Sequence, residues 1–187
     1  MELNVKVGVS NRHVHLTREV YDMLFDHEPT IKNELSQPGM VAYNECVTLK
    51  VGEREIESVR LLGPFRTYNQ VEISATDARL FKINPPIRQS GDLSGAEDIT
   101  LISDKATVNL KEACIIAKRH LHITPDEALR FGIKDDEELN IVVDREDGGV
   151  MKCYAKVAPN SALEIHLDTD NANAFSIKQG DIVKLVK

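Results

Sequence analysis

The sequence predicts a mainly β protein with short helices, folded as two related small β-barrel domains. Strand-like segments outnumber helical ones, and Gly-Pro, Pro-Pro, Ser-Gly and Gly-Gly steps separate them as turns. A motif of the form Arg-His-x-His-x-Thr also occurs twice, at residues 12–17 and 119–124. Since a motif repeated in the same local context indicates a duplicated unit, we expect domains at residues 1–95 and 96–187. The boundary is approximate, because a strand can cross it.

A helix is expected after each copy of the motif. Thr17 precedes the segment 18–25, in which apolar residues recur at helical spacing. In the second copy, Thr124 can cap a helix over 125–131, and Glu127 completes a capping box. Both halves are therefore predicted to contain a His-x-His strand followed by a short helix.

Most of the remaining chain has the pattern of strands. Short apolar runs rich in β-branched residues and bounded by turn residues are typical of small barrels and sandwiches. We expect strands at residues 46–51, 56–62, 70–74, 99–102, 138–144, 151–157, 163–167 and 181–186.

Composition and charge exclude several classes of protein. Hydrophobic residues make up 42% of the 187 residues and charged residues 28%, which is typical of a folded globular chain. The formal charge of −7 repels a polyanion and argues against nucleic acid as a partner. The apolar runs are shorter than the roughly 20 residues of a membrane span, and the first residues lack the apolar core of a signal peptide. We therefore expect a cytoplasmic protein with no membrane partner.

The three cysteines are expected to be core thiols. Cys46, Cys114 and Cys153 are far apart and include no Cys-x-x-Cys pair. This spacing argues against both a disulfide framework and a thiolate zinc cluster. Free cysteine is commonly buried and packs as a small apolar side chain.

The two His-x-His pairs have the spacing of metal ligands. In an extended strand, residues i and i+2 point to the same side, so the two histidines of a pair can direct their imidazoles at one point. The pairs are His13 with His15 and His120 with His122. A single pair would be weak evidence, because histidine is a common polar residue. Two copies in one context favour a metal site.

Two further side chains complete a set of six candidate ligands. His166 lies in a strand pattern and can add a fifth imidazole, while Glu72 alternates with apolar neighbours and can face inward. Zinc readily takes imidazole nitrogen and carboxylate oxygen, and a catalytic zinc characteristically has three protein ligands and one open position. Six ligands would therefore make two such sites.

Two arginines in turn-rich segments are candidates for binding phosphate. Arg66 follows the turn at 63–65, and a guanidinium can bind phosphate through two parallel hydrogen bonds. Arg88 lies in the loop 85–92, which also offers a hydroxyl and a flexible backbone. The alternative for each is structural, a surface arginine in the first case and a turn in the second.

At this point the sequence resembles the phosphate propanoyltransferase family. The resemblance spans nearly the whole chain, and several ordered motifs of this length are highly specific. The motifs are Ser-Asn-Arg-His-Val-His-Leu at 10–16, Leu-Ser-Gln-Pro-Gly at 35–39, Gly-Pro-Phe-Arg at 63–66, Gln-Val-Glu-Ile-Ser at 70–74, Pro-Pro-Ile-Arg-Gln-Ser-Gly-Asp-Leu at 85–93, Ala-Lys-Arg-His-Leu-His at 117–122 and His-Leu-Asp-Thr-Asp-Asn-Ala-Asn-Ala at 166–174.

The resemblance implies reversible transfer of a short acyl group, propanoyl or acetyl, between coenzyme A and inorganic phosphate. It also implies two zinc ions in a dinuclear site between two barrels, acyl phosphate as the product and a homodimer. Carried onto matching positions, one zinc would be held by His13, His15 and His166, and the other by Glu72, His120 and His122. Arg66 would bind the phosphate as the catalytic residue, and Ser10, Asn11 and Asn173 would contact coenzyme A.

Under this interpretation, phosphate attacks the thioester directly. No cysteine or serine stands in a nucleophile–base arrangement, so a covalent acyl-enzyme is not expected. Family members from microcompartments carry an N-terminal amphipathic extension, whereas the first motif here begins at residue 10. A cytosolic fermentative role is therefore the expectation.

Two other classes of function stay open. A metal-dependent hydrolase or thioesterase can also use His-x-His, although the barrel hydrolases with this signature need about 250 residues of alternating strand and helix. A non-catalytic metal-binding module would need fully ligated metals and no phosphate site.

Overall fold

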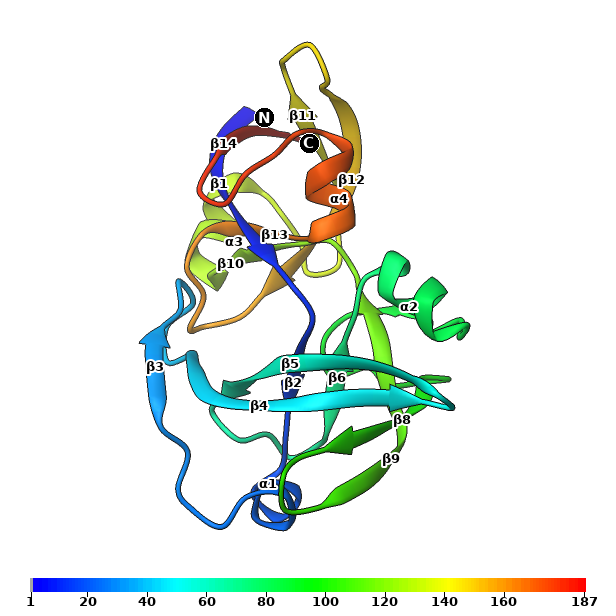
Figure 1. Ribbon diagram of the computed structural model, residues 1–187. Helices are drawn as coiled ribbons and strands as arrows, with labels where there is room; N and C mark the ends of the chain where they lie inside the picture. Colours follow the sequence, from blue (N-terminus) through cyan, green and yellow to red (C-terminus); the bar gives the residue numbers. More distant parts are fainter. Residues whose placement is uncertain (1) are drawn as a thin grey trace. The chain divides into compact units, whose positions relative to one another are not determined.

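The computed structural model describes residues 2–187 and is mainly β, with fourteen strands and four short helices in that range (Figure 1). The expected fold class is confirmed. The chain divides into two compact units. Unit 1 comprises the described residues up to Asn11, together with Ser36–Pro38 and Lys118–Lys187, and unit 2 comprises Arg12–Leu35 and Gly39–Ala117.

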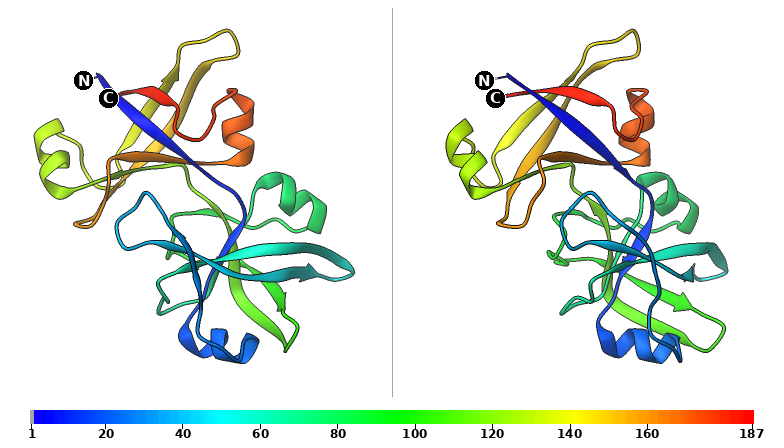
Figure 2. Two further views of the ribbon diagram at one scale, coloured as in Figure 1. Left: turned by 60° about the vertical axis from the view of Figure 1, so that its left-hand side comes forward. Right: turned by 90° about the vertical axis from the view of Figure 1, so that its left-hand side faces the viewer.

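The strands of unit 1 form a closed barrel. The order around it is β1 (Glu2–Ser10), β13 (Glu164–Asp168), β10 (His120–Ile123), β12 (Gly149–Val157), β11 (Glu138–Val143) and β14 (Ile182–Val186). Helix α3 (Pro125–Phe131) follows β10, and α4 (Thr169–Ala174) follows β13. Fully buried aliphatic side chains such as Val7, Leu121 and Ile165 fill the interior. Because β1 and β14 are antiparallel neighbours, the first residues of β1 lie beside the last residues of β14 (Figure 2).

Unit 2 contains a second closed circuit of six paired strands. It runs β4 (Val41–Val51), β5 (Arg54–Gly63), β2 (His13–His15), β6 (Gln70–Glu72), β9 (Thr107–Ala117) and β8 (Glu97–Ile102), and β8 pairs back to β4. The short strands β3 (Ile31–Glu34) and β7 (Ile87–Arg88) pair with β4 and β9, and the helices are α1 (Arg18–Leu24) and α2 (Ala75–Phe81). Its buried core includes Val14, Leu61 and Val71.

The two circuits have the same pairing scheme, so the repeated motif marks a duplicated fold. The His-x-His strand β2 pairs parallel with β5 and antiparallel with β6, and β10 pairs parallel with β12 and antiparallel with β13. The next strand round each circuit is parallel, β9 beside β6 and β1 beside β13. The prediction of two related small barrels is thereby confirmed.

The strand that precedes each His-x-His motif lies in the barrel of the other repeat. β1 leads into β2 but completes unit 1, and β9 leads into β10 but completes unit 2. The units therefore differ from the expected division at residue 95, since residues 97–117 lie in unit 2 and β1 lies in unit 1. The cause is strand pairing, because β1 is bonded to β13 from Lys6 to Ser10 and to β14 from Glu2 to Lys6.

Local capping signals predicted two of the four helices. The Thr17 side chain accepts a hydrogen bond from the Val20 N–H at the start of α1, and Thr124 forms a capping box with Glu127 at the start of α3. Helices α2 and α4 were not predicted. The expected strand at 70–74 ends instead at Glu72, because Ser74 caps α2.

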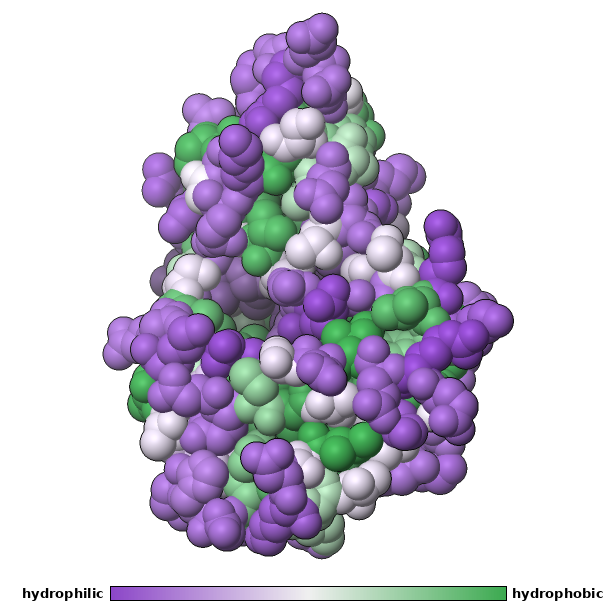
Figure 3. All heavy atoms as spheres, viewed as in Figure 1, coloured by the Kyte–Doolittle hydropathy of each residue, from purple (hydrophilic) through white to green (hydrophobic). Residues whose placement is uncertain are grey.

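No helix within residues 2–187 is long and apolar enough to cross a membrane. Hydrophilic residues cover most of the face shown in Figure 3, and hydrophobic residues form separate small patches on it. Leu129, 84% exposed, is the most accessible of the large apolar side chains in the described part of the chain. Singly exposed apolar residues are ordinary in globular proteins.

The cysteines allow a direct test of the core. Cys114 and Cys153 are fully buried, and burial raises the pKa of each thiol to about 12. Since the thiolate is the reactive form, iodoacetamide at pH 8 should label the native protein only at Cys46, which is partly exposed. Mass spectrometry should find one label per native chain and three after denaturation. Rapid labelling of Cys114 or Cys153 in the native protein would contradict the packing described here.

Candidate metal centres

Unit 2 gathers three predicted ligands in one buried group, which we call the first triad: His13, His15 and Glu72. His13 and His15 lie on the same side of β2, and the β2–β6 register places His13 opposite Glu72. The His13 Nε2 and Glu72 Oε2 atoms are 3.4 Å apart. One potential ligand atom from each residue lies within 4.8 Å of the others.

Unit 1 contains a corresponding group, the second triad: His120, His122 and His166. The β10–β13 register places His120 opposite His166, as β2–β6 does for His13 and Glu72. The Nε2 atoms of His120 and His122 face each other at 3.0 Å. The Nδ1 atom of His120 lies 2.7 Å from the Lys118 carbonyl oxygen, to which it can donate, and this contact fixes the ring with Nε2 toward the group.

The grouping differs from the expected distribution of ligands. His166 was expected beside His13 and His15, and Glu72 beside His120 and His122. The structure instead places Glu72 with the first pair and His166 with the second. The reason is that each third ligand lies on the strand paired antiparallel to its own His-x-His strand. All six predicted ligands nevertheless fall into the two triads.

The donors of both triads fit zinc. Zinc ligands lie roughly 2.0–2.1 Å from the metal, so two ligands at a tetrahedral angle are roughly 3.3 Å apart. The distances of 3.4 Å in the first triad and 3.0 Å in the second are close to that separation. In addition, the buried Nδ1 of His15 has no hydrogen-bond partner among the described residues, and a buried polar atom without a partner is costly unless a ligand occupies it.

His15 is held in the neutral form that a metal requires. Burial is the main cause, and the neighbouring His13 adds to it, so that the pKa of His15 falls to about 3. Glu72 opposes this shift without reversing it. A neutral imidazole has a lone pair available for a metal ion at any working pH.

Two buried side chains beside the triads were missed by the sequence analysis. Gln70 lies opposite His15, and Glu164 lies opposite His122, each two residues before the third ligand of its triad. Burial by itself would raise the pKa of Glu164, but hydrogen bonds from His166 and Ser36 outweigh it and lower the pKa to about 2. The signal that could have found these residues is the alternation in Gln-Val-Glu and Glu-Ile-His, which puts them on the ligand side of the strand.

The arginine before each His-x-His motif anchors the helix that follows the third ligand. Arg12 makes two 2.9 Å contacts with the carboxylate of Asp77 in α2. Arg119 donates through Nη1 to the side-chain oxygen of Asn171 in α4, at 2.7 Å. A planar guanidinium bonded in this way limits how the adjoining strand can turn. These contacts therefore help to hold each histidine pair against its third ligand.

Arg66 has the properties expected of an anion-binding side chain. Its Nη1 donates to the Tyr68 hydroxyl at 3.2 Å and its Nη2 lies 3.7 Å from the Met40 sulfur, while the buried Nε has no partner within the described residues. No carboxylate among residues 2–187 forms an ion pair with it. The backbone N–H of Arg66 donates to the carbonyl oxygen of Leu16, the residue after His15, at 2.8 Å, and the positive charge of Arg66 contributes, after burial and His13, to the lowered pKa of His15.

The other residues predicted to contact substrate are Arg88, Ser10, Asn11 and Asn173. Arg88 is occupied within its own loop, where it donates to the carbonyl oxygens of Ser94 and Ile87. Ser10 ends β1 opposite Asp168, the residue that caps α4, and Asn173 is an exposed residue of α4. Asn11 is the exposed residue after Ser10. Their roles in binding substrate stay predictions.

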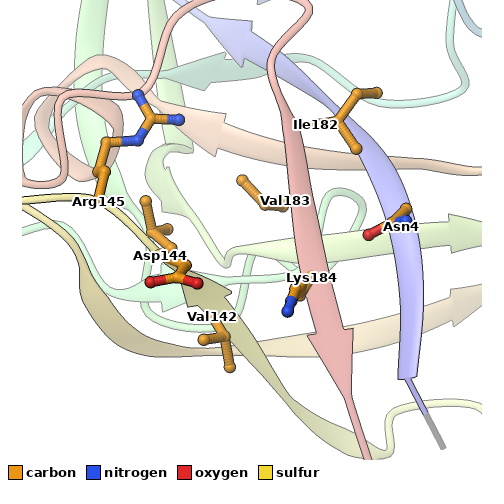
Figure 4. A pocket seen from close by; sticks show the side chains of 8 residues that line it. Asn4, Val142, Asp144, Arg145, Ile182, Val183 and Lys184 are labelled. Carbon is orange, nitrogen blue, oxygen red and sulfur yellow. The ribbon is translucent and has the colours of Figure 1, made fainter.

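Unit 1 also contains a pocket that the second triad does not line. The side chains that border it come from β1, β14 and the end of β11 with the residues after it, and they include no member of the second triad (Figure 4). They are Asn4, Val142, Val143, Asp144, Arg145, Ile182, Val183 and Lys184.

Comparison with known proteins finds the same family along nearly the whole chain. The family model described as phosphate propanoyltransferase matches residues 6–178. A phosphate propanoyltransferase of Thermotoga maritima is 43% identical, over 100% of this chain and 90% of its own length. Proteins of the same name from Lachnoclostridium phytofermentans and Salmonella typhimurium are 44% and 40% identical, over 97% and 91% of this chain and 87% and 82% of their own lengths.

The chain belongs to the phosphate propanoyltransferase family. It is accordingly an acyltransferase, and its reaction is acyl transfer between coenzyme A and phosphate. The resemblance found in the sequence motifs is thereby confirmed.

For this member of the phosphate propanoyltransferase family, metal content can be tested triad by triad. On the hypothesis that each triad binds one zinc ion, each of His15→Ala and His122→Ala should lower the zinc content by one ion per chain, because each removes a candidate ligand from a different triad. The double variant should bind none. Inductively coupled plasma mass spectrometry on desalted protein measures this. His27→Ala is the matched control, since that histidine is half exposed and outside both triads. If either single variant lost both ions or neither, the assignment of independent ligand sets would be wrong.

Proposed function

We propose that this enzyme transfers a short acyl group, propanoyl or acetyl, between coenzyme A and inorganic phosphate at a dinuclear zinc site formed by the two triads. The observation that carries the proposal is the convergence of six buried or half-buried ligands into two sets of three in a member of this family. Three protein ligands and an open position are the characteristic arrangement of catalytic zinc. When bound, zinc would supply positive charge that draws phosphate to the site and offsets its negative charge.

Arg66 is proposed to position the phosphate. Its guanidinium forms no ion pair with a carboxylate among the described residues and lies close to the first triad. Its hydrogen-bond donors are therefore available for phosphate oxygens. Holding the phosphate in this way turns a bimolecular encounter into a step between groups that are already in position. The loss of translational and rotational freedom is then no longer part of the activation barrier, and this loss is a large part of the barrier for such a reaction.

The transfer is proposed to be direct, without an acyl-enzyme. A phosphate oxygen attacks the thioester carbonyl carbon, the carbon–sulfur bond breaks, and coenzyme A leaves as a thiolate that is then protonated by solvent. The acyl phosphate is the other product. Cys114 and Cys153 are unsuited to act as nucleophiles, because burial raises the pKa of both thiols.

The remaining assignments are also proposals. Ser10, Asn11 and Asn173 would contact coenzyme A. The partners would be acyl-CoA, inorganic phosphate and acyl phosphate, with a homodimer as the assembly and a location in the cytoplasm. The formal charge of −7 supports the expectation that nucleic acid is not a partner.

Thiol release from acetyl-CoA and propanoyl-CoA tests the reaction. It should require phosphate, disappear after chelation of the metal and return when zinc is added. Release should be followed with a thiol reagent, with and without phosphate, for each acyl-CoA. Phosphate-independent release would identify a thioesterase instead, and no release from correctly zinc-loaded protein would favour a non-catalytic metal-binding module.

Substitution of Arg66 tests the phosphate contact. Arg66→Ala should lower kcat/KM for phosphate roughly 100-fold or more, about 3 kcal/mol of transition-state stabilisation, because a preorganised charge contact is lost. Arg66→Lys should recover only part of it, since lysine cannot bind two phosphate oxygens in a planar fork. Arg130→Ala is the control, because Arg130 is exposed at the end of α3. Near-normal turnover in Arg66→Ala would remove this residue from the mechanism.

A further inference from the structure

The two triads differ in charge when only their own members are counted. The first triad contains one carboxylate, Glu72, whereas the second consists of three histidines. With neutral imidazoles, the first triad carries one negative charge and the second carries none. Two sites built on one duplicated fold would therefore attract a dication unequally.

The strand register identifies a residue that adds a carboxylate beside the second triad. His15 faces Gln70 across β2 and β6, and His122 faces Glu164 across β10 and β13. Gln70 and Glu164 thus occupy equivalent positions in the repeat. Both are buried, with exposed fractions of 0% and 2%.

Each of these residues contacts the third ligand of its triad, and the chemistry is complementary. The Gln70 amide Nε2 donates to Glu72 Oε1 at 2.6 Å, so an amide accompanies a carboxylate. The Glu164 Oε2 atom lies 2.8 Å from the His166 Nε2 atom, so a carboxylate accompanies an imidazole. With its partner included, each triad contains one carboxylate.

A segment from the first repeat holds Glu164 in place. The Ser36 hydroxyl donates to Glu164 Oε2, and the Gln37 amide Nε2 lies 3.4 Å from the same oxygen. Gln37 is itself fixed by paired hydrogen bonds with the backbone N–H and carbonyl of Ala162, at 3.0 and 3.1 Å. Ser36 and Gln37 belong to the Leu-Ser-Gln-Pro-Gly motif at 35–39, to which the acyl-transfer proposal gives no role.

The glycine on the neighbouring strand leaves the room that this pair needs. Gly8 of β1 lies opposite His166. A Cβ atom there would come within 3.0 Å of His166 Cδ2 and 3.1 Å of Glu164 Oε2. The Glu164 carboxylate and the His166 ring therefore pack directly against Gly8, and a larger residue there would displace them.

We propose that Glu164 is the positioning carboxylate of the second triad, held by Ser36 and Gln37, and that it gives this triad one carboxylate, as Glu72 gives one to the first. The inference rests on the proposed zinc function. If His166 takes the metal through Nδ1, its Nε2–H donates to Glu164, the arrangement by which carboxylates orient zinc-binding histidines. The carboxylate would then supply negative charge and fix the ring.

Zinc affinity measured at one triad at a time tests this role. In a His15→Ala background only the second triad is complete, and adding Glu164→Gln should weaken zinc binding there roughly 10- to 100-fold, the usual cost of losing such a partner. In a His122→Ala background only the first triad is complete, and the same substitution should leave its affinity within about twofold. Competition with a chromophoric chelator measures both constants. An affinity change below about threefold at the second triad would overturn the proposal.

A second variant keeps the test decisive if Glu164→Gln does not fold, which a thermal melt of the metal-free protein would reveal. Ser36→Ala leaves the carboxylate in place and removes one donor to it, so zinc binding at the second triad should weaken by a smaller factor, about two- to tenfold. No change in this variant would also count against the proposal. A wild-type protein that binds two zinc ions but shows no phosphate-dependent thiol release would instead sink the proposed function alone.

Discussion

Antiparallel pairing between a His-x-His strand and the strand that carries the third ligand is the constraint on which both candidate metal centres depend. It places His13 opposite Glu72 and His120 opposite His166. Side chains directly opposite one another on paired strands have Cβ atoms only about 5 Å apart, so three ligands converge without a long loop. A slip of one residue would turn each histidine pair to the other face of its strand. The buried alternate residues Val14 and Leu121 oppose such a slip, because it would expose them.

The duplicated fold extends this constraint beyond the ligands. Each third-ligand strand leads into a capped helix, and an arginine beside the His-x-His motif binds that helix: Arg12 to Asp77 in one repeat, Arg119 to Asn171 in the other. Because β1 and β9 each lie in the barrel of the other repeat, β1 is parallel to β13 and β9 is parallel to β6. Each third ligand is therefore supported on one side by its own His-x-His strand and on the other by a strand of the opposite repeat.

The two repeats differ most clearly in the charge of the side chains at equivalent positions. Glu72 and His166 occupy equivalent positions but differ in charge, and so do Gln70 and Glu164 in the opposite sense. One carboxylate is thus retained near each triad, contributed by the third ligand in one case and by its neighbour in the other. Arg66 belongs to one repeat only: the corresponding position after β12 has no such side chain, since Ala158 and Pro159 follow that strand. The two repeats therefore differ in the side chains around their triads.

The sequence by itself determined the fold class, the duplication, the capped helices after each His-x-His motif and the six candidate ligands, because these depend on alternation, caps and motif spacing, which act over a few residues. Only the tertiary structure decided that Glu72 joins His13, that β1 belongs with the C-terminal strands, and that Gln70 and Glu164 accompany the triads. Each of these depends on which strands pair across more than forty residues of chain. Pairing of this kind is set by burial of the whole barrel interior rather than by any local pattern.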